Sequence, residues 1–173
     1  MFFFRDPERH APTDPSAVVS PADGRVIVAG GPEPSAPPGC WRQVSIFLSP
    51  LDVHINRSPV DGRTVRVEYQ PGRFLPAYDA SAGAVNDRNE IWIDHDGESI
   101  VCRQVAGVLA RRVVCRLAPG DGVSAGQRLG LMKFGSRFDV FLPERAEMLV
   151  NVGDRVRAGE TVIARLGPRA IGA

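Results

Sequence analysis

"SPADGRVIV" (residues 20–28) and "SPVDGRTVRV" (58–67) are two copies of one pattern, and together they decide the fold. In each copy, a Pro-x-Asp-Gly turn leads into a run of β-branched residues that predicts a strand. A second pair, "GDGVSAGQRL" (120–129) and "GDRVRAGETV" (153–162), shares the pattern Gly-Asp-x-Val-x-x-Gly. Such self-similarity indicates a duplicated architecture, in which we expect most of the aspartates to form turns.

Outside these repeats, the periodicity is also that of strands. Alternating or β-branched runs predict strands over 25–29, 43–47, 63–69, 99–107, 111–117, 128–132, 138–142 and 161–166. The chain has 18 glycines and 15 prolines, which bound these runs and place surface loops at 30–39 and 79–90, the second with one helical turn. No segment has the pattern of a long amphipathic helix, so the predicted class is mainly β with few short helices.

The paired turns resemble those of biotinyl- and lipoyl-type domains, which are small flattened barrels with two halves related by a pseudo-twofold axis. Here the pattern occurs twice in interleaved form, which predicts a duplicated barrel-sandwich of this kind. A length of 173 residues is typical of one domain with its own core. We therefore expect a single domain over 1–173.

Composition excludes several classes of function. The net charge of +1 provides no field that would attract nucleic acid, and no apolar run reaches the roughly 18 residues that span a bilayer. Cys40, Cys102 and Cys115 have no Cys-x-x-Cys spacing, so we predict buried, reduced thiols in a cytosolic compartment and no metal site. The N-terminal "MFFF" (1–4) fits an interfacial foot, the remnant of a membrane segment, a disordered start or a tail on the core.

"LMKFGSRFDVF" (131–141) contains the candidate chemistry. The stretch fits an ordinary hairpin with a Gly-Ser-Arg turn, or a carrier hairpin that displays Lys133. In a third reading, the Ser136 hydroxyl attacks the carbonyl of Gly135, because glycine permits the strained backbone that such a reaction needs. That reaction also needs a base and a group to hold the base, which His54 and a buried aspartate could provide.

Several blocks together, including "SPADGRV", "SIFLSPLDVHINRSPVDGRTVRVEYQPGRFLPAY", "RQVAGVLARRVVC" and "GQRLGLMKFGSRFDVFLP", resemble the short, bacterial and archaeal type of phosphatidylserine decarboxylase. The resemblance runs from about residue 3 to residue 164. It implies a proenzyme that cuts itself between Gly135 and Ser136. The products would be a β chain (1–135) and an α chain (136–173), and Ser136 would become a covalent pyruvoyl group.

The resemblance also implies roles for Asp23 and His54, which match the family's catalytic aspartate and histidine. Long-form members carry a second histidine in a His-x-x-His pair, where this chain has Arg57. Either His54 serves both self-cleavage and decarboxylation, or another group supplies the base. A biotinyl/lipoyl-type carrier or adaptor that uses Lys133, and an inactive relative, remain as alternative readings.

By the same resemblance, the substrate is phosphatidylserine in a membrane surface and the product is phosphatidylethanolamine. Arg57 and Arg137 are the candidate ligands for the lipid phosphate or carboxylate, because the planar guanidinium pairs with two oxygens. The segment 72–78 and "MFFF" offer apolar groups for shallow insertion. We expect a peripheral enzyme on the cytoplasmic side of the cell membrane with no metal, and family analogy suggests a homodimer.

Overall fold

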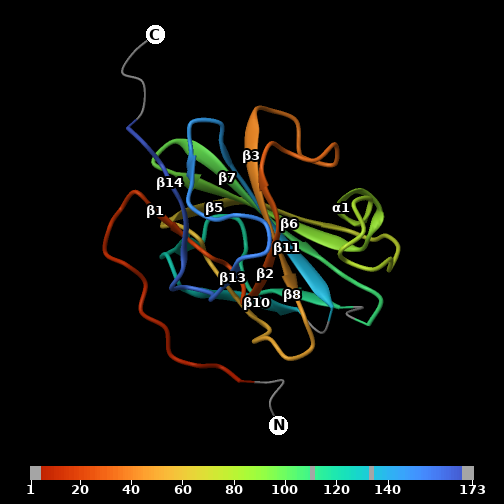
Figure 1. Cartoon of the computed structure of the whole chain (residues 1–173). Helices are drawn as coiled ribbons and strands as arrows, with labels where there is room; N and C mark the ends of the chain where they lie inside the picture. Colours follow the sequence, from red (N-terminus) through yellow and green to blue (C-terminus); the bar gives the residue numbers. More distant parts are fainter. Residues whose placement is uncertain (1–4, 110–111, 133–134, 169–173) are drawn as a thin grey trace.

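The computed structural model describes residues 5–109, 112–132 and 135–168, which form an almost entirely β structure (Figure 1). Its strands are β1 (Ala17–Val19), β2 (Gly24–Gly30), β3 (Trp41–Leu48), β4 (Ile55–Arg57), β5 (Gly62–Gln70), β6 (Arg88–His95), β7 (Glu98–Val105), β8 (Val113–Cys115), β9 (Gly122–Val123), β10 (Arg128–Met132), β11 (Ser136–Pro143), β12 (Glu147–Met148), β13 (Arg155–Val156) and β14 (Val162–Arg165). The only helix of the described residues is the single turn α1 (Ala82–Val85). The mainly β class is confirmed.

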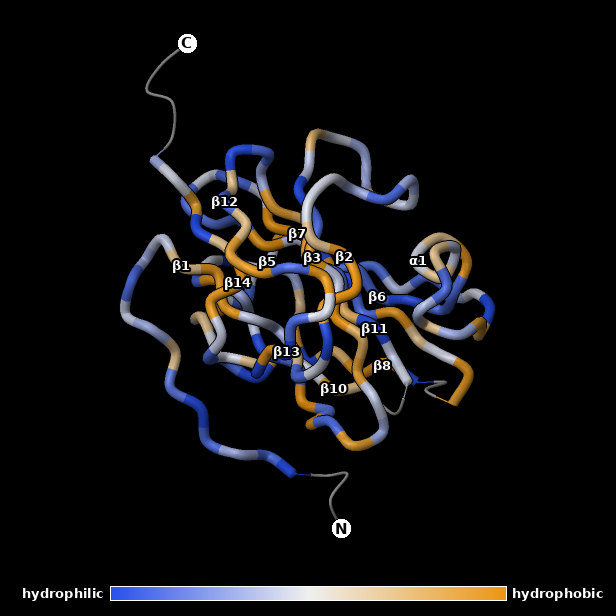
Figure 2. The backbone as a smooth tube through the Cα atoms, in the orientation of Figure 1, coloured by the Kyte–Doolittle hydropathy of each residue, from blue (hydrophilic) through white to orange (hydrophobic). Residues whose placement is uncertain are grey.

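The strands form one large sheet and two small ones, and every pairing of named strands is antiparallel. The large sheet has the order β13-β2-β3-β11-β7-β6-β5-β9. The small sheets are β1-β14-β12 and β4-β10-β8. In Figure 2, the hydrophobic parts of the chain gather where the strands cross, and the mostly hydrophilic N-terminal segment runs along the outside.

β11 lies inside the large sheet, between β3 and β7, and is buried on both faces. Because side chains alternate along a strand, Phe138, Val140 and Leu142 share one face and enter the main hydrophobic core. Arg137 and Asp139 lie on the other face and are also buried. A strand that is covered on both sides cannot shift its register without exposing apolar groups or unpairing charges, so its first residue is held in place.

The internal repeats contact one another in pairs, each early copy with one late copy. The turn at Asp23 packs against the second late copy, and Asp23 Oδ1 accepts the backbone N–H of Ala158 at 2.8 Å. The turn at Asp61 packs in the same way against the first late copy and accepts the N–H of Ala125 at 2.7 Å. Equivalent backbone bonds join Gly159 to Ser20 and Gly126 to Ser58, each at 2.8 Å. The two halves of the fold are therefore built by the same set of contacts.

Some expectations need correction. The Gly-Ser-Arg reading of a turn is wrong for its last two residues, because Ser136 and Arg137 already belong to β11 and Ser136 pairs with Leu48. β1, β4, β6 and β12 were not predicted as strands. β1, β4 and β12 have only two or three residues, too few to show a period, and the polar first residues of β6 were assigned to the loop at 79–90. Cys40 is exposed, whereas Cys102 is buried as expected and Cys115 is half-buried. The three thiols are free.

Candidate active site

Four segments that are far apart in sequence meet at one end of the strands of the large sheet. In register, Arg25 of β2 pairs with Phe47 of β3, and Phe47 pairs with Arg137 of β11. Arg137 also pairs with Val105, the last residue of β7. The sheet thus brings together the turn before β2, the end of β3, the start of β11 and the end of β7. We call this end of the strands, which contains Ser136, the scissile end.

Two connections between sheets also meet at the scissile end. Residues 49–54 join β3 to β4, and β10 leads toward β11 in the opposite direction. β3 pairs with β11 and β4 pairs with β10, so the strands on either side of residues 49–54 lie against the strands that come before and after the Gly135–Ser136 bond. The backbone N–H of Met132 donates to the carbonyl of His54 at 3.1 Å, which places the backbone of His54 close to the strand that precedes the Gly135–Ser136 bond.

Gly135 and Ser136 have the properties of a reactive peptide. Gly135 has a φ of +63°, in the left-handed region that disfavours residues with a side chain. Ser136 is fully buried, and its hydroxyl has no hydrogen-bond partner among the described residues. A buried hydroxyl in a structural role is normally hydrogen-bonded, because an unsatisfied one costs free energy. The geometry therefore favours a reactive role for this serine over that of a simple turn residue.

His54 is buried beside the acid Asp52. Burial, which disfavours the charged imidazolium, lowers the pKa of His54 below its ordinary value of 6.5, and Arg5 acts in the same direction. A backbone hydrogen bond with Pro50 and the charge of Asp52 oppose that shift in pKa. Asp52 is itself held by the N–H of Ser49 at 2.8 Å and by Arg155 at 2.8 Å. His54 is therefore neutral at pH 7, the state in which it can accept a proton.

Asp23 also lies at the scissile end, in the turn before β2. Its Oδ1 makes the turn bond to Ala158, and its Oδ2 accepts a hydrogen bond from Arg9 at 3.0 Å. Both carboxylate oxygens are thus engaged, one of them by a buried arginine of the N-terminal segment. The structure brings Asp23 to the correct end of the sheet and shows that its orientation depends on residues 9 and 158.

The two candidate arginines are both buried and differ in their partners. Arg57 donates to the carbonyls of Gly126 at 2.9 Å and Pro7 at 2.8 Å. Arg137 forms ion pairs with Asp139 and Glu33 on the face of β11 that points away from Ser136. In this arrangement both guanidinium groups serve the protein's own structure, so binding a lipid headgroup would require these bonds to rearrange.

A polar cluster in the core was not predicted from the sequence. Gln104 of β7 donates to Asn56 Oδ1 at 2.9 Å and accepts from Asn89 at 3.2 Å. All three side chains are buried, and Asn56 Nδ2 has no partner among the described residues. Asn56 follows His54 by two residues. An isolated Asn or Gln in a strand gives no sequence signal, and only the packing of β4 against β7 reveals the cluster.

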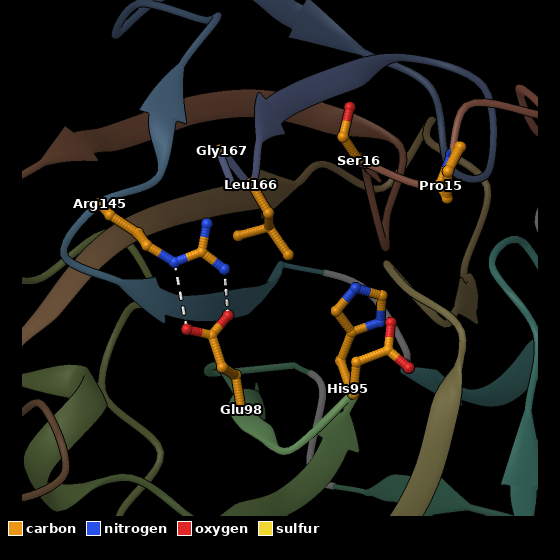
Figure 3. Close-up of a pocket in the computed structure, with 8 residues that line it drawn as sticks. Pro15, Ser16, His95, Glu98, Arg145, Leu166 and Gly167 are labelled. Carbon is orange, nitrogen blue, oxygen red and sulfur yellow. Dashed lines mark hydrogen bonds and ion pairs between the residues drawn. The ribbon is translucent and has the colours of Figure 1, made fainter. Parts of the chain in front are cut away.

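The described structure also has a surface pocket of about 390 Å³ that lies far from the scissile end (Figure 3). It is bordered by His95 in the β6–β7 hairpin, which is at the opposite end of β7 from Val105. The Glu98–Arg145 ion pair forms one wall. Asp23, His54 and Ser136 do not line this pocket, so it is not part of the candidate active site.

Two further expectations concern residues or groups outside this geometry. Lys133, the carrier lysine of the alternative reading, and the N-terminal "MFFF" lie outside the described residues. Among the described residues, no group of three or more His, Cys, Asp or Glu side chains is arranged to hold a metal ion. No helix in the described parts of the chain is both long and apolar enough to cross a bilayer.

The fold and site define a class: a mainly β protein in which a buried serine, with no hydrogen-bond partner for its hydroxyl among the described residues, follows a left-handed glycine, and a neutral histidine lies in the connection after β3. Comparison with known proteins agrees with the residues that suggested a proenzyme. The family model for phosphatidylserine decarboxylase matches residues 1–164. A phosphatidylserine decarboxylase proenzyme of Symbiobacterium thermophilum is 53% identical over 168 residues, which cover 96% of this chain and 78% of that protein.

Other relatives carry the same name. The phosphatidylserine decarboxylase proenzyme of Prosthecochloris aestuarii is 44% identical over 96% of this chain and 76% of its own length. That of Mycolicibacterium vanbaalenii is 45% identical over 95% of this chain and 72% of its own length. The chain belongs to the phosphatidylserine decarboxylase family.

Proposed function

We propose that this chain is a proenzyme that cuts itself between Gly135 and Ser136 and then decarboxylates phosphatidylserine to phosphatidylethanolamine and carbon dioxide. The observation that carries the proposal is the buried Ser136 hydroxyl, which has no hydrogen-bond partner among the described residues and follows a glycine with φ of +63°. Membership of the family, whose similar members are named proenzymes, supports both the reaction and the processing.

In the proposed self-cleavage, Ser136 Oγ adds to the carbonyl carbon of Gly135 as His54 takes the hydroxyl proton. The C–N bond then breaks, the nitrogen takes a proton, and an ester links the two residues. A base removes the Cα proton of Ser136 and the Cβ–Oγ bond breaks, which leaves a carboxylate on Gly135 and dehydroalanine at 136. Hydrolysis releases ammonia and leaves the pyruvoyl group. Asp23 is proposed to orient the base, although its carboxylate also serves the turn.

The residues around Ser136 fit such a group. Its precursor is an orphaned buried hydroxyl at the start of a strand that stays anchored after the cut. When formed, a pyruvoyl group supplies an electron sink for the carbon that loses carbon dioxide. His54 is the proposed proton acceptor and donor in turnover, because burial lowers its pKa below the ordinary value and keeps the imidazole in the neutral form that accepts a proton. Arg57 and Arg137 remain the proposed ligands of the substrate's anionic groups.

We further propose that the enzyme works at the cytoplasmic surface of the cell membrane. Four exposed apolar side chains belong to loops of the scissile end: Leu51, Tyr78, Val108 and Leu109. Leu51 lies in the 49–54 connection, and the Tyr78 ring packs on Phe47 with the centroids 6.0 Å apart. Val108 and Leu109 follow the end of β7. Such groups favour shallow insertion near the substrate, and free thiols favour a reducing compartment.

The remaining proposals concern architecture. We infer one domain over 1–173 with the duplicated barrel-sandwich design of biotinyl- and lipoyl-type domains, and by family analogy a homodimer. The matching contacts of the Asp23 and Asp61 turns support the duplication. The pairing of early with late segments supports a single domain: β2 pairs with β13 and β5 pairs with β9, so strands from both parts of the chain are needed to complete the sheet.

One experiment separates the readings. On a denaturing gel, the purified protein should give two fragments, and the smaller should begin with a blocked residue and have the mass of a pyruvoyl-started 136–173 chain. Ser136→Ala should remain one polypeptide and release no carbon dioxide from phosphatidylserine, whereas Ser99→Ala, an exposed serine at the far end of β7, should process normally. An intact chain with added mass on Lys133 would indicate a carrier, and an unmodified intact chain an inactive relative.

A further inference from the structure

Gly107 lies against the carbonyl group that the proposed reaction attacks. A Cβ atom at Gly107 would fall 1.9 Å from the carbonyl oxygen of Gly135 and 3.0 Å from its carbon. Gly107 is not among the glycines with positive φ, so its backbone conformation is open to any residue. The requirement for glycine at 107 is therefore one of space: the oxygen of the scissile peptide occupies the place of a side chain.

The chain around Gly107 is held so that it cannot retreat from this contact. The N–H of Ala106 donates to the carbonyl of Asp87 at 2.9 Å. The carbonyl of Ala106 accepts a bond from Asn86 Nδ2 at 2.7 Å. Asn86 is fully buried and is itself fixed to both backbone groups of Leu75, at 2.8 and 3.1 Å. Any atom added at 107 must therefore displace the Gly135 carbonyl, because the end of β7 is anchored.

We propose that Gly107 is a positioning residue for self-cleavage, which holds the Gly135 carbonyl in the orientation that Ser136 Oγ attacks. This inference rests on the proposed function. As the Oγ–C bond forms, the hydroxyl proton passes to the base and the carbonyl electrons move onto oxygen, so the planar group becomes tetrahedral. The oxygen needs a fixed direction and room beside it during that change. A misplacement of about 1 Å can slow such a step roughly 10²-fold.

The test compares two glycines with similar clashes. Gly107→Ala should slow the appearance of the two fragments by about 10²-fold. Gly62→Ala is the matched control, because its Cβ would fall 2.4 Å from the carbonyl oxygen of Asp94, at the far end of β6 from the scissile end. Its processing should stay near that of the wild type. Thermal unfolding of both variants, measured in the uncleavable Ser136→Ala background, shows whether their structural costs are comparable.

A second readout separates a positioning role from general damage. Hydroxylamine cuts an ester but not a peptide bond under mild conditions, so it reports whether the first step has taken place. The unprocessed Gly107→Ala chain should resist hydroxylamine, because the ester never forms. If Gly107→Ala yields no folded protein, Asn86→Ala takes its place: it releases the carbonyl of Ala106 and should slow processing without adding an atom near Gly135.

The outcomes are distinct. Wild-type protein that stays whole would overturn the proposed function itself. The role of Gly107 would be overturned if Gly107→Ala were processed at the same rate as the wild type. It would also be overturned if hydroxylamine cut the unprocessed Gly107→Ala chain at 135–136. Where only Asn86→Ala folds, processing at the wild-type rate would overturn it as well.

Discussion

Asp23 and Asp61 perform the same structural task in two different turns, one before β2 and one before β5. Each carboxylate accepts one backbone N–H of the opposing repeat, from Ala158 and Ala125 respectively. Only Asp23 lies at the scissile end, and only Asp23 is paired with Arg9. The duplication thus supplies an internal control that distinguishes a turn-forming role from a catalytic one.

Replacing each aspartate with alanine should separate the two roles. Both Asp23→Ala and Asp61→Ala lose a turn hydrogen bond, worth about 1 kcal/mol of stability, so both should lower the melting temperature. Only Asp23→Ala should also slow self-cleavage, as followed by the loss of intact chain on a gel. Equal processing rates in the two variants would show that Asp23 is only a turn former.

The rate of self-cleavage should fall at low pH, where His54 becomes protonated and can no longer act as the base. We call this fall the acid limb of the pH–rate profile. Because burial lowers the pKa of His54, the imidazole stays neutral until the pH falls below 6.5, and the processing rate should fall only on the acid side of that value. Asp52→Asn removes a charge that raises this pKa, so the midpoint should move to still lower pH. Rates measured from pH 4.5 to 8 give the profile.

His95→Gln is the matched control for this profile. His95 lies in the far hairpin, where its ring contacts the carbonyl of Asp61, so the acid limb should be unchanged. If the midpoint of the acid limb lay above pH 6.5, or did not change in Asp52→Asn, His54 would not be the base.

At the scale of elements, β11 explains how a cut chain can stay whole. The break would fall at its first residue, while the strand itself remains paired with β3 on one side and with β7 on the other. Phe138, Val140 and Leu142 lie in the main core, and the α chain also supplies β14, which pairs with β1 and β12. The cut therefore severs one covalent bond without removing an element.

The two chains should consequently remain associated after processing. Gel filtration without denaturant should give one species that contains both fragments, and they should separate only in urea or guanidinium. Phe138→Ala, which deletes a fully buried ring at a cost of about 3–5 kcal/mol, should lower the denaturant concentration at which they separate. Fragments that part in plain buffer would contradict this account of β11.

At the scale of the molecule, one end has both the candidate chemistry and exposed apolar groups. Leu51, Tyr78, Val108 and Leu109 surround the scissile end, while the hydrophilic N-terminal segment crosses the outside of the fold (Figure 2). A substrate with acyl chains in a bilayer can reach the site most easily if this end faces the lipid. The proposed membrane orientation follows from that distribution.

Polar substitutions at this end should weaken membrane binding without affecting self-cleavage. Leu51→Ser combined with Leu109→Ser removes two apolar side chains that are 75% and 68% exposed, so co-sedimentation with phosphatidylserine vesicles should decrease several-fold. Val65→Ser, on β5 away from this end, should bind like the wild type. Equal binding by all three proteins would place the lipid-facing surface elsewhere.

Much of the fold was predictable because it depends on local signals. Turn residues and β-branched runs predicted most strands, and the repeated Pro-x-Asp-Gly and Gly-Asp-x-Val patterns marked turns that contact one another in pairs. β1, β4 and β12 were missed because they have only two or three residues, and β6 because its polar first residues extend the preceding loop. The Gly135–Ser136 pair was visible for a similar reason: the chemistry that it suggests needs two adjacent residues, and adjacency is what a sequence displays.

Contacts between distant segments were decided only by the tertiary structure. No pattern around residue 107 shows that its glycine gives room to a carbonyl 28 residues further along, and none around Gln104 indicates Asn56 as its partner. The same applies to Arg9, which reaches Asp23 from the N-terminal segment. Sequence determined which residues form most of the strands and which peptide is the candidate for cleavage, because those properties belong to neighbours along the chain. The surroundings of that peptide depend on which strands the sheet places side by side.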